Sequence, residues 1–243
     1  MRTIGVIPAR YGSTRLAAKV LAHIQGKPMI QHVWERAKKS RVLDELLVAT
    51  DDQRIIDTVE AFGGKAVMTG AHHQSGSDRI AQAVKSLKYD VVINIQGDEP
   101  LITYPVIDAL GKAMKKDAKC VMATVITPLH DALEVENPNT VKVVIDQDQN
   151  ALYFSRSAIP YNRAEVAGKE VGYFKHLGIY AYRKSFLLKI TKWPKSHLEK
   201  MESLEQLRVL EAGYKIKTVL TDAATISVDT REDLLKVEEF LRK

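Results

Sequence analysis

Cysteine is almost absent from this chain of 243 residues, in which Cys120 is the only one. A single cysteine can form neither an internal disulfide nor a cysteine-based zinc site, so the sequence carries no sign of an oxidising compartment. Cys120 lies in the apolar stretch 120–123, where we expect a small buried core residue rather than a reactive nucleophile.

Long apolar runs are also missing, since no stretch approaches the ~20 residues that a helix needs to span a bilayer. The apolar segment at residues 1–8 is too short for a signal peptide and lacks a small-residue cleavage pattern. We therefore expect a cytoplasmic protein that does not insert into a membrane.

The charge balance is basic, with 36 Lys and Arg against 30 Asp and Glu and a formal net charge of +6. The lysines are scattered along helix-like segments, such as 112–119 and 184–195, and no zinc-finger, helix-turn-helix or RNA-recognition pattern accompanies them. We expect a solvated basic surface, part of which serves an anionic substrate, rather than a nucleic-acid partner.

Two common nucleotide motifs, G-x-G-x-x-G and G-x-x-x-x-G-K-[ST], are absent as well, which argues against a dehydrogenase or an ATPase. The first half instead alternates short apolar runs with segments of helical spacing as far as about residue 115. This alternation favours an α/β fold with a parallel sheet and helices on both faces. The expected strands are 4–7, 46–50, 66–68 and 90–96, and the expected helices are 29–39, 55–62 and 78–87.

The second half has a different texture, in which short strands dominate. Residues 141–145 and 151–154 flank an Asp/Gln/Asn turn, which predicts a hairpin. Further strands are expected at 178–182 and 215–219, before a closing helix at 231–241. With no repeat, low-complexity segment or flexible linker, the chain is interpreted as a single domain, 1–243, with a β-rich part around 125–220.

The first segment that indicates chemistry is 8–19, directly after the first expected strand, where open α/β sheets place their ligands. Arg10, Arg15 and Lys19 lie close to the Gly12-Ser13 turn. Backbone N–H groups at such a turn can hold phosphate oxygens, and the cations can offset the charge of a triphosphate. From composition alone, a solvated basic loop is an equally good interpretation.

Two carboxylates occupy comparable places in the two halves of the chain. Asp98 follows the clearest buried strand, and Asp229 lies between a β-rich run and the last helix. Each can hold Mg²⁺ bound to substrate phosphates. Each can also cap a helix, and for Asp229 the following Glu232 would complete a capping box. Taken singly, neither signal settles the choice.

Together, these segments resemble the CMP-Kdo synthetase family, the 3-deoxy-manno-octulosonate cytidylyltransferases. In the first half the matching strings are IPARYGSTRL (7–16), ATDD (49–52), SGSDR (75–79) and NIQGDEP (94–100). In the second half they are ALYFSRSAIP (151–160), KHLGIY (175–180), LEQLR (204–208) and VDT (228–230). The resemblance covers nearly the whole chain in the right order, and the combination of motifs is highly specific.

The resemblance implies a Rossmann-like nucleotidyltransferase with a mixed, mostly parallel sheet and a small β-rich part that forms a homodimer. It implies a Mg²⁺-dependent enzyme that transfers CMP from CTP to the anomeric hydroxyl of the eight-carbon sugar acid Kdo, releasing pyrophosphate, for lipopolysaccharide biosynthesis in the cytoplasm. A related acid, such as amino-Kdo or a sialic acid, is the nearest alternative. A sugar-nucleotide glycosyltransferase and a basic nucleic-acid-binding protein are more distant ones.

By motif position, the resemblance also implies roles for individual residues. The CTP-binding residues would be Ala9, Arg10, Ser13, Arg15, Lys19, Ser77, Arg79 and Gln96. Asp98 and Asp229 would bind the metal and, with Arg15 and Lys19, form the catalytic set. The sugar acid would contact Arg156, His176, Tyr180, Glu205 and Gln206, with His176 giving hydrogen bonds rather than acting as a base.

The phosphate loop departs from the family pattern at one point. The family reads Arg-Leu-Pro-Gly-Lys, whereas this chain has Ala17 and Ala18 before Lys19. Alanine does not adopt the positive-φ conformations of glycine cheaply, so we expect an altered loop geometry with the class of reaction unchanged. The pair His72-His73 and the two tryptophans, Trp34 and Trp193, are expected to be an exposed loop and packing residues, respectively.

Overall fold

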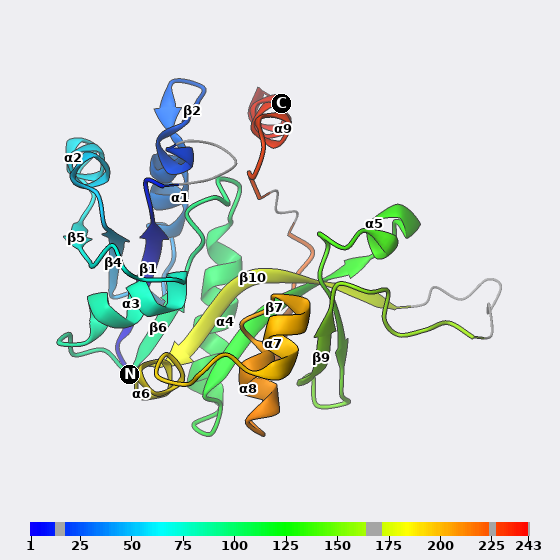
Figure 1. Cartoon of the computed structure of the whole chain (residues 1–243). Helices are drawn as coiled ribbons and strands as arrows, with labels where there is room; N and C mark the ends of the chain where they lie inside the picture. Colours follow the sequence, from blue (N-terminus) through cyan, green and yellow to red (C-terminus); the bar gives the residue numbers. More distant parts are fainter. Residues whose placement is uncertain (13–17, 164–171, 224–226, 243) are drawn as a thin grey trace.

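The computed structural model describes residues 1–12, 18–163, 172–223 and 227–242. Its centre is a nine-stranded sheet in the order β11-β7-β10-β6-β1-β4-β5, in which β8 also pairs with β10 and β9 pairs with β8 (Figure 1). The first half supplies four parallel strands: β1 (Thr3–Ala9), β4 (Glu45–Thr50), β5 (Ala66–Met68) and β6 (Val91–Asn94). The predicted fold class is therefore confirmed.

Helices cover both faces of this sheet, as the alternation predicts. One face packs against α1 (Met29–Ala37), α2 (Gln53–Ala61) and α4 (Tyr104–Lys116), and Ile7 and Val48 lie in that core. The other packs against α3 (Gly76–Val84), where Val6 and Ala49 belong to a second core. Because neighbouring residues of one strand enter opposite cores, the buried strands are apolar throughout rather than alternating.

The second half extends the sheet with strands of the opposite direction. The 11-residue strand β10 (Tyr173–Arg183) runs antiparallel to both β6 and β7 (Met122–Leu129), and β11 (Lys217–Leu220) lies parallel to β7. The predicted hairpin is present as β8 (Lys142–Ile145) and β9 (Ala151–Ser155), and β8 pairs with the start of β10. This hairpin and α5 (Ala132–Glu136) lie to one side of the main sheet (Figure 1).

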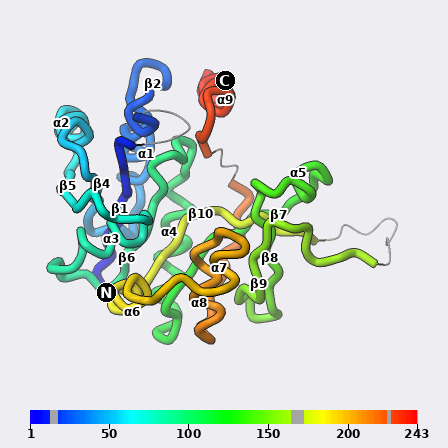
Figure 2. Tube along the Cα trace, in the orientation of Figure 1, coloured from blue at the N-terminus to red at the C-terminus, as the bar shows by residue number. Residues whose placement is uncertain are grey.

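Several short elements connect these layers. Before α1 come the 3-10 helix η1 (Lys19–Leu21) and the strands β2 (His23–Ile24) and β3 (Lys27–Pro28). Later ones are α6 (Lys184–Ile190), α7 (His197–Glu202) and α8 (Leu207–Glu211), and α9 (Arg231–Arg242) closes the chain. Figure 2 shows α9 beside β2 despite their separation in the sequence, and Val237 shares a small core with Ile24.

None of the helices in the described part of the chain combines the length and the apolar character that a membrane span requires. Cys120 is half-buried against the core, and burial raises the pKa of its thiol, so it is not a reactive thiolate. Trp34 is a buried core residue and Trp193 packs against Phe186 and Tyr214, as expected for packing residues.

Candidate active site

Three adjoining cavities lie where β1 and β6 end, the edge at which open α/β sheets bind ligands. We name each for a lining residue: the Lys19 cavity of about 320 Å³, the Asn94 cavity of about 270 Å³ and the more open Arg156 cavity of about 930 Å³. Gln96, two residues after β6, lines all three. The cavities therefore form one continuous region around this side chain.

The glycine after Gln96 sets how closely the two strand ends approach each other. A Cβ atom built on Gly97 would lie 3.1 Å from the carbonyl oxygen of Pro8, closer than most real Cβ contacts. A residue without a side chain is thus needed here, and it brings Asp98 to the wall of the Lys19 cavity beside Ala9 and Arg10.

A single ammonium group joins the two predicted metal ligands. Lys19 Nζ donates to Asp98 Oδ2 at 2.6 Å and to Asp229 Oδ1 at 2.9 Å. Burial disfavours the charged ammonium, but the two carboxylates outweigh it and raise the pKa of Lys19 above its usual value. Two acidic side chains that are far apart in the sequence therefore converge on one cation.

The capping role considered for Asp229 belongs to its neighbours. Thr230 Oγ1 accepts from the Asp233 backbone N–H at 3.2 Å, and the Asp233 carboxylate accepts from the Thr230 backbone N–H at 3.0 Å. This reciprocal pair lies one residue later than a capping box of Asp229 and Glu232, the second of the two interpretations left open for Asp229. Asp98 does not cap α4 either, since Thr103 precedes that helix.

The donor set at this point suits a hard divalent cation that shares its ligands with a substrate. Within the described ranges, no three His, Cys, Asp or Glu side chains gather as a self-contained metal site. Magnesium is commonly held by one or two carboxylates while phosphates and water complete its shell. Asp98 and Asp229 supply two such oxygens, and the Lys19 ammonium between them marks the place of a cation.

The backbone of Ala18, the residue before Lys19, adopts a conformation that is costly for alanine. Ala18 has φ 50° and ψ 34°, in the left-handed region, and it immediately precedes η1. For a residue with a Cβ atom this conformation costs roughly 1–2 kcal/mol. Lys19 nevertheless reaches both carboxylates, so these contacts do not require proline or glycine at positions 17 and 18.

Five further predicted CTP residues fall into three groups. Ala9 and Arg10 line the Lys19 cavity, the first buried and the second exposed. Ser77 lines the Asn94 cavity instead. Ser13 and Arg15 lie outside the described residues.

Arg79 lines the Lys19 cavity as a buried part of its wall, with 4% of its surface exposed. Its guanidinium donates to Asp51 Oδ2 and to Thr69 Oγ1, both at 2.7 Å. Because these acceptors follow β4 and β5, Arg79 ties the start of α3 to two neighbouring strand ends. Its guanidinium is therefore committed to shaping the cavity.

Four of the five predicted sugar-acid residues line the Arg156 cavity: Arg156, His176, Tyr180 and Gln206. The fifth, Glu205, lies at the boundary between the Asn94 and Lys19 cavities. The ring of His176 packs between Phe154 and Tyr180, at centroid distances of 4.8 and 5.4 Å. Burial lowers the pKa of His176 to about 3, and its Nε2 bonds to Thr124 Oγ1 at 2.9 Å.

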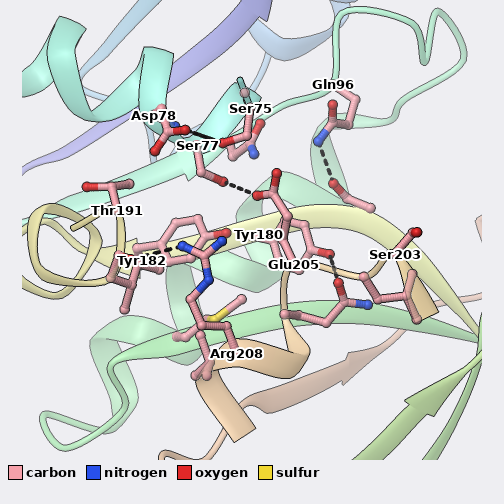
Figure 3. A pocket seen from close by; sticks show the side chains of 18 residues that line it. Ser75, Ser77, Asp78, Gln96, Tyr180, Tyr182, Thr191, Ser203, Glu205 and Arg208 are labelled. Carbon is pink, nitrogen blue, oxygen red and sulfur yellow. Dashed lines mark hydrogen bonds between the residues drawn. The ribbon is translucent and has the colours of Figure 1, made fainter. Parts of the chain in front are cut away.

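Figure 3 shows the Asn94 cavity from close by, with Ser77 and Glu205 pointing toward one another. Ser77 Oγ donates to Glu205 Oε2 at 3.1 Å, and the Tyr180 hydroxyl donates to Gln206 Oε1 at 3.2 Å. Burial raises the pKa of the Glu205 carboxyl, although the Ser77 hydrogen bond opposes this shift. Two predicted CTP residues, Ser77 and Gln96, and three predicted sugar residues thus meet in this cavity.

Several lining residues were not among the predicted site residues, and four of them carry polar groups of interest. Lys175 and Glu99 line the Arg156 cavity, Asn94 lines the cavity named for it, and His73, expected to lie in an uninvolved exposed loop, lines the Lys19 cavity. Burial, and then the neighbouring Asp98, raise the pKa of the Glu99 carboxyl to about 8. The signal for Glu99 was available in the sequence, as a second carboxylate between Asp98 and the apolar stretch 100–102.

Comparisons with known proteins agree with this geometry. A family model described as cytidylyltransferase matches residues 4–216. The chain is 49% identical to the 3-deoxy-manno-octulosonate cytidylyltransferase of Fusobacterium nucleatum, over 100% of this chain and 98% of that protein. It is 51% identical to the enzyme of the same name from Phocaeicola vulgatus, again over 100% and 98% of the two chains.

A solved structure of CMP:2-keto-3-deoxy-manno-octonic acid synthetase complexed with CTP superposes with a TM-score of 0.95. It shares 46% sequence identity and is matched over 99% of its length by 100% of this chain. A cytidylyltransferase structure from Leptospira borgpetersenii, at 17% identity and a TM-score of 0.67, shares the fold.

Proposed function

Because this chain belongs to the 3-deoxy-manno-octulosonate cytidylyltransferase family, we propose that it transfers CMP from CTP to the anomeric hydroxyl of Kdo, giving CMP-Kdo and pyrophosphate. One structural observation supports the proposal at the level of individual side chains. Asp98 and Asp229 converge on the Lys19 ammonium at the wall of a cavity that adjoins the predicted sugar pocket. Charge neutralisation and positioning, the main needs of phosphoryl-type transfer, thus meet at one point.

The Lys19 cavity would hold the nucleotide. Lys19 and Arg10 offer positive charge for the triphosphate, and the backbone around Ala9 lies close enough for direct contact with a ligand. The raised pKa of Lys19 keeps its ammonium charged throughout the physiological pH range, so it can offset charge on the departing pyrophosphate. Arg79 would set the width of the cavity through its bonds to Asp51 and Thr69.

Magnesium is the cofactor that we propose for this site, with Asp98 and Asp229 as its protein ligands. When bound, it would supply a Lewis acid that stabilises negative charge on the phosphates and lowers the pKa of the attacking hydroxyl. Lys19 would then give up its contacts with the two carboxylates and turn its ammonium to the phosphates. One side chain can serve the carboxylates and the phosphates in turn, because both carboxylates line the cavity that would hold the nucleotide.

The sugar acid would lie between the Arg156 and Asn94 cavities, where Tyr180 and Gln206 line both. His176 is a weak base because its pKa is about 3, so its neutral ring would orient groups by hydrogen bonding. This supports the hydrogen-bonding role over that of a general base. Attack of the anomeric oxygen on the α-phosphorus would break the bond to the bridging oxygen and release pyrophosphate.

We further propose a cytoplasmic homodimer that supplies CMP-Kdo for lipopolysaccharide synthesis. CTP is a cytoplasmic metabolite, which supports the location. Large apolar side chains are exposed in and beside the β-rich part: Leu133 at 82%, Leu152 at 60% and Tyr161 at 87%. Such side chains are typical of a surface that a second copy covers, and sedimentation of the purified chain measures the oligomeric state directly.

The experiment that tests the proposed function is a panel of nucleotides and sugar acids with pyrophosphate release as the readout, with and without Mg²⁺. We expect turnover with CTP and Kdo, loss of turnover with EDTA, and less activity with ATP, GTP or UTP. Amino-Kdo and a sialic acid test the alternative substrates. Absence of pyrophosphate release from CTP and Kdo in the presence of Mg²⁺ would refute the proposal.

A further inference from the structure

Two buried polar atoms in the wall of the Asn94 cavity have no hydrogen-bond partner among the described residues: Asn94 Oδ1 and Gln206 Nε2. Asn94 is 2% exposed and Gln206 is 4% exposed, so bulk water does not compensate either atom. Nearly all buried polar atoms in folded proteins are paired. One unpaired acceptor and one unpaired donor in the same small cavity therefore point to a ligand that carries both kinds of group.

The backbone of Asn94 is fixed on both sides by the sheet. Asn94 is the last residue of β6, and it pairs with Val6 of β1 and with Tyr180 of β10. Side chains of directly paired residues share a face of the sheet, and Tyr180 lines the same cavity. The side chain of Asn94 thus faces the cavity. The strands around it are held by backbone hydrogen bonds, which do not involve this side chain.

The lining of the Asn94 cavity suits an uncharged polyol. Its polar groups include the Ser75, Ser77 and Ser203 hydroxyls and the Asp78 and Glu205 carboxyls (Figure 3). Arg208 is its one basic side chain among the described lining residues, and Glu199 holds that guanidinium at 2.5 and 2.6 Å. A carboxylate or phosphate in this cavity would therefore meet acidic groups and no uncommitted cation.

Three cations, Arg156, Lys175 and Lys236, line the Arg156 cavity beside six carboxylates, which include Asp98 and Asp229. Gln96, Tyr180 and Gln206 line both cavities, so one elongated ligand can occupy the two together. In the Asn94 cavity the carboxylate of a sugar acid would meet acidic groups and no uncommitted cation. Its uncharged end therefore lies toward Asn94, and its carboxylate lies toward the Arg156 cavity, which holds three cations and the two proposed metal ligands.

We propose that the Asn94 cavity is the subsite for the polyhydroxy tail of the sugar acid, and that Asn94 is a specificity-determining residue that accepts a hydrogen bond from a tail hydroxyl. Gln206 Nε2 donates to a second oxygen of the same tail. The inference rests on the proposed function. It adds the orientation of the sugar acid in the site and a residue that recognises a hydroxyl of its tail.

The test compares kcat/KM for Kdo with kcat/KM for sugar acids that each lack one tail hydroxyl or are shortened at that end. For the wild-type enzyme we expect one position at which removal of the hydroxyl lowers kcat/KM by about 100-fold, because Asn94 Oδ1 then stays unpaired. Asn94→Ala should lower kcat/KM for Kdo by about 10- to 100-fold. In this variant kcat/KM should be the same for Kdo and for the analogue that lacks the critical hydroxyl. Its KM for CTP should stay that of the wild type.

Two further variants keep the test decisive. Thr191→Val alters the same cavity, but the Thr191 hydroxyl already donates to the Leu187 carbonyl oxygen at 3.2 Å, so the wild-type analogue pattern should persist. Asn94→Asp keeps an acceptor oxygen and should recover part of the activity lost in Asn94→Ala. If Asn94→Ala does not fold, the wild-type analogue series and Asn94→Asp carry the test.

Three results would overturn the inference: equal wild-type activity on all tail analogues, an equal loss for wild type and Asn94→Ala with each analogue, or a raised KM for CTP in Asn94→Ala, which would place the nucleotide in this cavity. Failure of the proposed function is a separate outcome, because wild-type enzyme would then release no pyrophosphate with Kdo itself.

Discussion

Two lysines in this molecule are buried in opposite ways. Lys19, in the active site, donates to two carboxylates and keeps 14% of its side chain exposed to the cavity. Lys142, at the start of the β8–β9 hairpin, is fully buried, and its Nζ donates to the carbonyl oxygens of Asn137, Thr140 and Arg156 at 2.6–2.8 Å.

The partners decide what each ammonium group can do. Carboxylates raise the pKa of Lys19 despite its burial, whereas burial lowers the pKa of Lys142 because neutral carbonyl groups do not offset the lost hydration. A metal ion or a phosphate can compete for the partners of Lys19. Lys142 instead holds the loop before β8 and the backbone of Arg156 together, at the wall of the Arg156 cavity. Lys19 can therefore exchange its carboxylate partners for a ligand, whereas Lys142 stabilises the hairpin.

The largest effect should come from the carboxylates of the Lys19 region. We expect Asp98→Asn to lower kcat by at least about 1,000-fold, because it removes a charged metal ligand at the site of charge development, while the free energy of unfolding changes by less than about 1 kcal/mol. Asp131→Asn is the matched control, since that carboxylate caps α5 beside the hairpin by accepting from Leu133 N at 2.9 Å. Mg²⁺-dependent turnover that survives in Asp98→Asn would show the metal assignment to be wrong.

Replacing each lysine by methionine tests the comparison directly. Lys142→Met should lower the free energy of unfolding by about 3 kcal/mol, since three carbonyl groups lose their donor inside the protein. Lys19→Met should lower it by less than about 1 kcal/mol, because its partners remain near solvent, while kcat/KM for CTP falls sharply. Urea titration with steady-state kinetics measures both quantities. Equal losses of stability in the two variants would contradict the division of roles.

A pH effect is expected on the hairpin side from His176, whose backbone N–H donates to the Val141 carbonyl oxygen. Its folded-state pKa of about 3 lies below its unfolded value of 6.5, so its contribution to stability is complete above pH 6.5 and is lost as the pH falls toward 3. Between pH 7.5 and 5 this amounts to about 2 kcal/mol. Urea unfolding at both pH values should show that His176→Gln loses about 2 kcal/mol less stability than the wild type between pH 7.5 and 5. If both proteins lose the same stability over this range, His176 titrates normally.

The smallest effect concerns the strained residue beside Lys19. Ala18→Gly should raise the free energy of unfolding by about 0.5 kcal/mol, since glycine adopts the positive φ without steric cost but loses more backbone entropy on folding. Ala113→Gly, within α4, is the control with the opposite sign and should destabilise by about 1 kcal/mol. A destabilised Ala18→Gly would show that the left-handed conformation carries no strain.

The sequence predicted the architecture best in residues 1–96, where apolar strands alternate with helices. The nine-residue helices α1, α2 and α3 have clear periods and were confirmed, as were the apolar strands β1, β4, β5 and β6. The longest helix, α4, and the buried eight-residue strand β7 were not among the expected elements. The helices α5 to α8 have five to seven residues, too few to show a period, and were missed as elements. The first half of β10 was missed because it carries half-buried polar residues such as Lys175.

The site was predictable in its members and less so in its contacts. The positions of Asp98 and Asp229 beside strand ends indicated acidic residues at a common edge, and the structure brings them together. That Lys19 would lie between them, or that Asn94 would keep an unpaired oxygen, depends on distances between remote segments. No local pattern of residues encodes such distances, so three-dimensional packing was needed to find them.

The irregularity in β10 limits how the chain can change in length. Opposite β7, Leu177 pairs with Val125 and Tyr180 pairs with Thr124, so Gly178 and Ile179 are extra residues in β10. Because side chains alternate between faces, two extra residues preserve the phase of the strand whereas one would reverse it. Insertions or deletions at this bend are therefore compatible with the site only in pairs, since a single residue would turn His176 away from the face that Tyr180 occupies.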